Sequence, residues 1–183
     1  MTTSTAPSNI ILPAVGSPFE GGFYAGQILI AGAPHALIVA LKSGGGEFAT
    51  IAWHNRSKAV QGALSFSDGL ANTRAMAKAG SRLATQVVDL RIAGFDDWYL
   101  PARDELEILY RAFKPTADQN WCWRGDNPNS IPAGEAYMPD APAQTSIEAF
   151  RGGGPEAFES TWYWSSTQYA GIESDAWAQH FDA

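Results

Sequence analysis

The chain has 183 residues, of which 45% are hydrophobic and 17% charged, so it has enough apolar material for one folded domain. Twelve Lys and Arg stand against 19 Asp and Glu, giving a net charge of −7, which excludes the basic clusters needed for nucleic acid or an anionic membrane surface. The single cysteine, Cys122, excludes an internal disulfide framework and a multi-thiolate metal site. We also expect no membrane insertion, because no apolar stretch is long enough, and no signal-peptide export.

The N-terminal segment differs in composition from the rest of the chain. Residues 1–18 are rich in Ser, Thr, Pro and Ala and contain one apolar patch at residues 10–12. This pattern predicts an arm, which is either an unstructured terminus or an assembly strap that packs on a neighbour. We therefore assign residues 1–18 to an N-terminal arm and residues 19–183 to one domain.

Apolar runs separated by Gly and Pro predict strands at the start of the domain. A hairpin is expected over residues 22–42, with its turn at residues 31–34, and a third strand over residues 48–53. Ser67 and Asp68 can cap a helix that extends to about residue 90, with a break at Gly80-Ser81.

A second helix is predicted over residues 102–113, because Pro101 precedes it and apolar residues recur on one face, at Leu106, Leu109, Tyr110 and Phe113. The following residues, 114–143, contain five prolines and no periodicity, which predicts a long loop. Thr145 and Glu148 form a capping-box pattern for a short helix ending near Arg151. Alternating aromatic residues predict strands over residues 162–167 and 176–181.

Two segments resemble a known signature. Residues 94–106 read GFDDWYLPARDEL, and residues 163–167 read YWSST, followed by Ala176-Trp177 and Phe181. Together they resemble the Lcl C-terminal-domain-like family over residues 20–183. The resemblance implies an α+β fold of the C-type-lectin-like class, in the formylglycine-generating-enzyme branch, with small mixed antiparallel sheets, two or three helices and long loops. It also implies an association with bacteriophages.

These motifs are typical of a folding signature more than of a catalytic site. We expect Trp98, Trp164 and Trp177 to anchor the core, and Ser165 and Ser166 to satisfy loop backbone groups.

The chain departs from the family pattern at two places. Ala102 stands where the family has Ser or Thr, so a helix cap is absent or replaced. The family continues past the position of Ala183 into a final strand. Either the sequence is truncated, or a neighbouring chain adds that strand at the sheet edge.

We expect no catalytic residues and no enzyme activity, because the oxidase chemistry of the related branch needs paired cysteines. His35, His54 and His180 lack metal-ligand spacing, so no metal site and no cofactor are expected. Calcium stays open as an alternative, because oxygen ligands gather in the long loop, whereas turn formation by Asx residues explains the same side chains. These residues are Asp126, Asn127, Asn129 and Asp140.

Binding is the remaining class of function. By resemblance to C-type-lectin-like domains, the loops near the C-terminal sheet form a variable recognition surface, and their Tyr, Trp and Ser side chains suit sugar and protein ligands. The predicted ligand-binding residues are Trp121, Trp123, Tyr169, Ile172, Ser174, Asp175, Gln179 and His180.

The resulting hypothesis is a phage virion protein at a tail fibre or baseplate tip. It would be made in the host cytoplasm and located in the virion tail, as a homo-oligomer in contact with other virion tail proteins. Its ligand would be a host surface glycan or protein. The alternative is a purely structural tail or assembly protein whose lectin-like domain makes subunit contacts.

Overall fold

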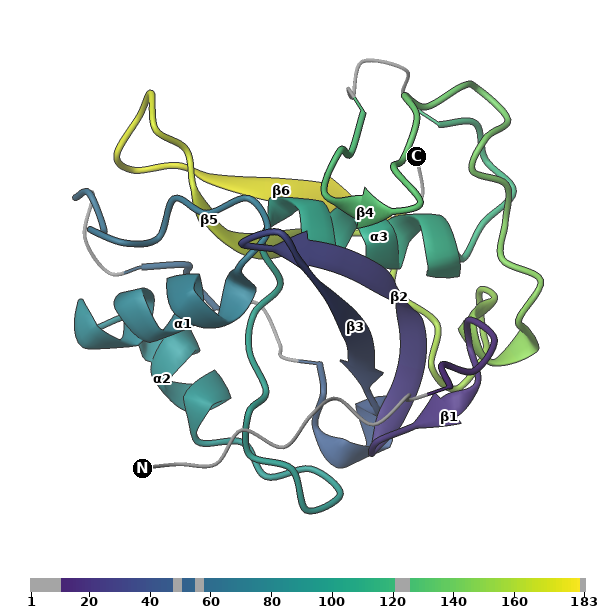
Figure 1. The fold of residues 1–183 in the computed structure, drawn as a ribbon, viewed down its shortest axis with the longest axis horizontal. Helices are drawn as coiled ribbons and strands as arrows, with labels where there is room; N and C mark the ends of the chain where they lie inside the picture. Colours follow the sequence, from purple (N-terminus) through teal and green to yellow (C-terminus); the bar gives the residue numbers. More distant parts are fainter. Residues whose placement is uncertain (1–10, 48–50, 55–57, 121–125, 182–183) are drawn as a thin grey trace.

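The computed structural model of the chain describes residues 11–47, 51–54, 58–120 and 126–181. Their fold is α+β, with three α-helices and two small antiparallel sheets (Figure 1). In chain order the elements are β1 (Pro18–Phe19), β2 (Gly22–Ile30), β3 (Ala33–Ala40), the 3₁₀ turn η1 (Lys42–Gly44), α1 (Gly69–Lys78), α2 (Arg82–Val88), α3 (Arg103–Phe113), β4 (Ser130–Ile131), the 3₁₀ turn η2 (Glu148–Phe150), β5 (Trp162–Gln168) and β6 (Ala176–His180).

The first sheet is built on the predicted hairpin, which is confirmed. β2 and β3 pair antiparallel around Ala31 and Gly32, whose positive φ values of 50° and 82° are those of a two-residue hairpin turn. The short strands β1 and β4 both pair with β2, at residues 22–23 and 27–28 respectively. β1 begins at the last residue of the predicted arm, so the end of that segment joins the sheet. Ile11, in the predicted apolar patch, is 91% exposed.

The predicted break between two helices is confirmed at Gly80 and Ser81. α1 is capped at its start by Asp68, whose carboxylate accepts from the Ala71 N–H, and it ends before Gly80, which has a φ of 91°. Ser81 then caps α2 by accepting from the Ala84 N–H and donates its own hydroxyl to the Trp53 carbonyl at 2.7 Å. The cap residue therefore also ties the start of α2 to Trp53, which lies in the segment before α1.

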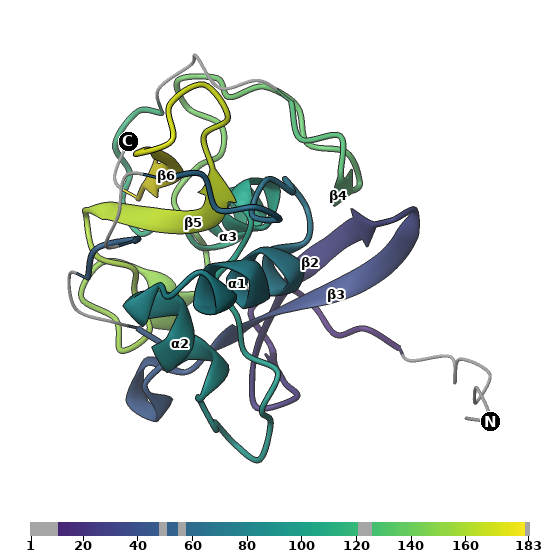
Figure 2. The same ribbon diagram turned by 90° about the vertical axis from the view of Figure 1, so that its left-hand side faces the viewer.

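α3 is the central element of the fold and confirms the second predicted helix. One side packs on the first sheet, where Ile108 and Phe113 join Ile28 and Leu37 of β2 and β3 in a buried cluster. Its other side packs on the C-terminal sheet through a second cluster, formed by Leu106, Tyr110, Tyr137 and Phe181. Figure 2 shows α3 between the two sheets, with α1 and α2 beside them.

One predicted strand and one predicted helix cap are wrong. Of the third strand, residues 48–50 lie outside the described residues, and residues 51–53 are not strand, because Trp53 instead packs against α1 and α2 and donates its indole N–H to the Ser165 carbonyl at 2.7 Å. The short helix after Thr145 is only the 3₁₀ turn η2, without a side-chain cap. The Thr145 hydroxyl donates to the Ala112 carbonyl of α3 instead, at 2.9 Å.

The second sheet consists of β5 and β6, which confirms both predicted strands with ends shifted by one residue. Their register places Trp162 opposite His180 and Trp164 opposite Ala178. Because the Tyr163 side chain points inward, onto Phe158 and Phe181, both flanking tryptophans point outward. Trp164 is 43% exposed, so its expected role as a core anchor is wrong.

Candidate functional site

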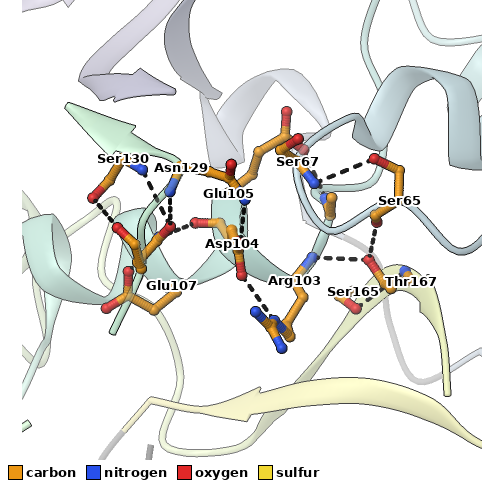
Figure 3. Close-up of polar contacts among 12 residues, drawn as sticks. Ser65, Ser67, Arg103, Asp104, Glu105, Glu107, Asn129, Ser130, Ser165 and Thr167 are labelled. Carbon is orange, nitrogen blue, oxygen red and sulfur yellow. Dashed lines mark hydrogen bonds and ion pairs between the residues drawn. The ribbon is translucent and has the colours of Figure 1, made fainter. Parts of the chain in front are cut away.

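The two signature segments meet at the N-terminus of α3. The backbone N–H of Ser166 in β5 donates to the Pro101 carbonyl at 2.7 Å. The N–H of Arg103, the first residue of α3, donates to the Thr167 hydroxyl oxygen at 3.0 Å (Figure 3). The Thr167 hydroxyl in turn donates to the Ser65 carbonyl at 2.7 Å. The Thr167 hydroxyl thus satisfies a backbone N–H that the start of α3 leaves unpaired, and the other two bonds join β5 to the segments beside that start, which is a structural role for the signature.

At Ala102 only the Glu105 half of a capping box is present, and the acceptor for the Asp104 N–H is the Phe66 carbonyl, at 2.9 Å. Alanine has no acceptor, but the Glu105 carboxylate reaches back to accept from the Ala102 N–H at 2.7 Å, from the Gly69 N–H at 3.1 Å and from the Tyr99 hydroxyl at 3.0 Å. The side chain is almost fully buried, and this burial raises the pKa of Glu105 to about 7, against the opposing effect of the hydrogen bonds it accepts. Glu105 therefore joins the starts of α1 and α3.

Buried polar side chains hold the long loop on α3. The Asn127 amide donates to the Glu107 carboxylate at 2.6 Å and to the Asp104 carbonyl at 2.9 Å, and the Asn129 amide donates to the Asp104 carboxylate at 2.8 Å. The Asn127 side-chain oxygen accepts from the N–H groups of Asn129 and Ser130. The alternative of a turn-forming Asx residue thus explains Asn127, whereas the Asn129 side chain is held by the Asp104 carboxylate.

The other two calcium candidates, Asp126 and Asp140, are exposed. Within the described residues, no group of three or more His, Cys, Asp or Glu side chains is placed to hold a metal ion.

Next to the signature junction lies an exposed aromatic surface, which we call the tip surface and define as Phe66, Arg103, Tyr169, Ile172 and Trp177. The Arg103 guanidinium lies over the Phe66 ring, 3.7 Å from its centroid, and 5.3 Å from that of Trp177. The Trp177 ring also contacts the edges of Phe66 and Tyr169. Phe66 and Tyr169 are each 40% exposed and Ile172 is 52% exposed.

The loop between β5 and β6, which carries Tyr169 and Ile172, is held by its own hydrogen bonds. The Tyr169 N–H donates to the Asp175 carbonyl at 2.8 Å, and the Asp175 N–H donates to the Ile172 carbonyl at 3.0 Å. The buried Gln168 amide donates to the Glu173 carbonyl at 2.6 Å. The exposed side chains are therefore presented by a loop of defined shape, which lowers the entropy cost of binding.

The sequence model of the Lcl C-terminal domain matches residues 49–183. The chain belongs to the Lcl C-terminal domain family. The match contains both signature segments and begins after the β1–β3 part of the first sheet. Among curated proteins and among solved structures, nothing matches the chain. Across the described ranges, no helix has both the length and the apolar character needed to cross a membrane.

In this Lcl C-terminal domain, the residues predicted to bind a ligand separate into three groups. Tyr169, Ile172, Ser174 and Asp175 lie together and exposed in the β5–β6 loop (the yellow loop in Figure 1). Gln179 and His180 lie at the opposite end of the hairpin. The first is buried and the second packs against Trp162, with ring centroids 5.0 Å apart. Trp121 and Trp123 lie outside the described residues.

Sequence reasoning missed Phe66 and Arg103 as members of this surface. Phe66 precedes the helix-capping residues Ser67 and Asp68, and Arg103 lies inside the first signature, so neither position shows a local pattern that indicates binding. Trp177, expected in the core, is half-buried and contributes one face to the tip surface. Of the two signature serines, Ser165 accepts from the Thr167 N–H, as expected, whereas the Ser166 hydroxyl is buried without a hydrogen-bond partner among the described residues.

Proposed function

We propose that this Lcl C-terminal domain is a non-enzymatic binding module that recognises a host surface glycan or protein through the tip surface. The observation that carries the proposal is the exposure of Tyr169 and Ile172 on the hydrogen-bonded β5–β6 loop, beside an exposed Phe66 ring on which the Arg103 guanidinium stacks. Aromatic rings with an arginine are typical of binding hot spots, because they offer a large contact area at a low cost in side-chain entropy.

We further propose a C-type-lectin-like architecture and a place in a phage virion, at a tail fibre or baseplate tip. The architecture is supported by the two signature segments and by the α+β arrangement of small antiparallel sheets joined by long loops. The setting rests on the resemblance of those segments to phage-associated relatives. Partners in the tail and a homo-oligomeric state belong to the same proposal.

Binding of the purified protein to intact candidate host cells tests this function. The test variant is Tyr169→Ala/Ile172→Ser, which removes two exposed side chains and leaves the loop's backbone hydrogen bonds in place. Because each hot-spot side chain contributes roughly 1 kcal/mol or more, we expect the half-saturating concentration to rise about tenfold or more. The matched control is Met138→Ala, which removes a 63% exposed apolar side chain from a different loop and should leave binding unchanged.

Saturable binding that is equal for the wild type and the folded double variant would contradict the tip surface as the recognition site. Absence of binding by the wild type to every candidate host would contradict the receptor-binding function itself. Circular dichroism of each variant separates these outcomes from loss of folding.

The purely structural role remains the second candidate, and the exposure of Ile11 favours it. The Ile11 side chain is 91% exposed at the start of the described chain, so it is accessible to a neighbouring subunit. If this role is correct, Ile11→Ser lowers the molar mass measured by light scattering, whereas the tip-surface variant leaves that mass unchanged.

A further inference from the structure

A cavity of about 550 Å³ lies between β3, α2, α3 and the start of β5, apart from the tip surface. This volume is in the range of small-molecule sites, about 300–1,000 Å³. Its wall combines aromatic side chains with aliphatic ones, among them Leu37, Val39, Leu83, Val87, Leu90 and Leu109. Such a wall favours an apolar ligand body over a sugar.

Charged residues lie in the lining as well. Deep in the cavity the lining includes Glu105, whose carboxylate is taken up by the N–H groups of Ala102 and Gly69 and by the Tyr99 hydroxyl. Among the described lining residues the one cationic side chain is that of Lys42, so an anionic group deep in the cavity would have no cation beside it.

The cavity reaches the surface where Trp162 and Glu159 line it, because the Trp162 residue is 62% exposed and the Glu159 side chain 71% exposed. At this mouth the Lys42 ammonium pairs with the Glu47 carboxylate at 2.8 Å and the Glu159 carboxylate at 3.1 Å. A third carboxylate, that of Glu156, accepts from the Lys42 backbone N–H at 2.8 Å. The mouth therefore contains three carboxylates and one ammonium, two of the carboxylates being paired with that ammonium, so its formal charge is negative.

We propose that this cavity binds a small cationic amphiphile, that is, an apolar chain or ring that carries one ammonium group. The apolar part lies against the aliphatic wall and leaves water, while the ammonium stays at the mouth, attracted by the excess carboxylates. The exposed Trp162 ring offers a further favourable surface for the cation. The same charges repel an anionic amphiphile, so charge at the mouth selects the ligand and the wall provides affinity.

Calorimetric titration of the full chain near neutral pH tests the proposal with three probes that share one eight-carbon chain. Octylammonium, octyl glucoside and octyl sulfate are each used below the concentration at which they form micelles. We expect octylammonium to bind with one-to-one stoichiometry, at least fivefold more tightly than octyl glucoside, and octyl sulfate to give no binding. Equal affinity for the cationic and neutral probes would overturn the proposal, as would no binding of octylammonium.

Two variants locate the binding. Glu159→Lys removes the negative charge of the mouth at an exposed position, and it should weaken octylammonium about tenfold without changing octyl glucoside. Its matched control, Glu135→Lys, makes the same charge change at an exposed residue away from the cavity and should have little effect. Equal weakening by both would mean that overall charge attracts the probe, which would overturn the assigned site.

Leu109→Trp fills part of the cavity from a half-buried position and should abolish binding of both probes. A folded Leu109→Trp protein that still binds octylammonium would overturn the site. If this variant does not fold, the comparison of Glu159→Lys with Glu135→Lys decides the question. The Tyr169→Ala/Ile172→Ser variant should bind octylammonium normally, which distinguishes failure of this proposal from failure of the tip surface.

Discussion

Replacing Glu105 with glutamine tests how the buried carboxyl at the start of α3 affects stability. In the folded protein the pKa of Glu105 is raised from its ordinary value of 4.5 to about 7, mainly by burial. Between these two pH values the unfolded chain has lost the proton that the folded protein retains. Stability is therefore fully present below about pH 4.5 and decreases as the pH rises through 7, by about 3 kcal/mol in total.

Glutamine has a similar shape and keeps one oxygen that can accept from the Ala102 or Gly69 N–H, but it does not ionise. We expect the free energy of unfolding of Glu105→Gln, relative to wild type, to increase by about 3 kcal/mol between pH 4.5 and 8. Urea denaturation followed by tryptophan fluorescence at several pH values measures this difference. The exposed Glu148→Gln serves as the control and should follow the wild type throughout.

The opposite trend would refute the reasoning. If wild type gained stability relative to Glu105→Gln as the pH rose, the three hydrogen bonds accepted by the carboxylate would outweigh its burial. If the difference in the free energy of unfolding stayed constant with pH, the effects of burial and of the hydrogen bonds on the pKa would cancel. Glu105 would then join α1 and α3 without making stability depend on pH.

Two further changes test the packing around α3. Thr167→Val keeps the side-chain shape but removes the acceptor of the Arg103 N–H. We expect it to lower the free energy of unfolding by about 1–3 kcal/mol, measured by urea denaturation. An unchanged midpoint would show that the fold does not depend on the signature junction. Phe113→Ala removes a fully buried ring stacked on Phe150, with ring centroids 3.9 Å apart. We expect it to lower the free energy of unfolding by about 3–5 kcal/mol, visible as a large drop in the thermal midpoint. A loss below about 1 kcal/mol would contradict the assignment of this cluster as core.

Local signals predicted the elements of the fold well where the chain itself supplies the conformation. The hairpin turn at Ala31 and Gly32 and the helix break at Gly80 both depend on residues that adopt positive φ in the structure. The α3 face containing Leu106 and Tyr110 likewise follows from spacing over a few residues. These features need no information from distant parts of the chain, so composition and periodicity suffice for them.

Burial was less predictable, because it depends on which element covers each face. In β5 the aromatic alternation correctly predicts a strand, but it does not tell whether Tyr163 or its neighbours face the core. The contacts of Tyr163 with Phe158 and Phe181 settle that choice and leave Trp162 and Trp164 exposed. Farther along the strand, residues 165–168 are all buried, because other segments cover both faces there.

The candidate sites also contain features that the sequence predicted and features that only the tertiary structure reveals. Sequence reasoning placed Tyr169 and Ile172 in a presented loop, because polar and small residues between two strand patterns indicate a turn. It could not bring Phe66, Arg103 and Trp177 together, since their contacts join segments that are far apart in the chain. The cavity likewise depends on four separate elements, and its charge on the convergence of Lys42 and distant carboxylates. Short-range rules specify backbone conformation, whereas surfaces and cavities arise from long-range packing, which periodicity does not encode.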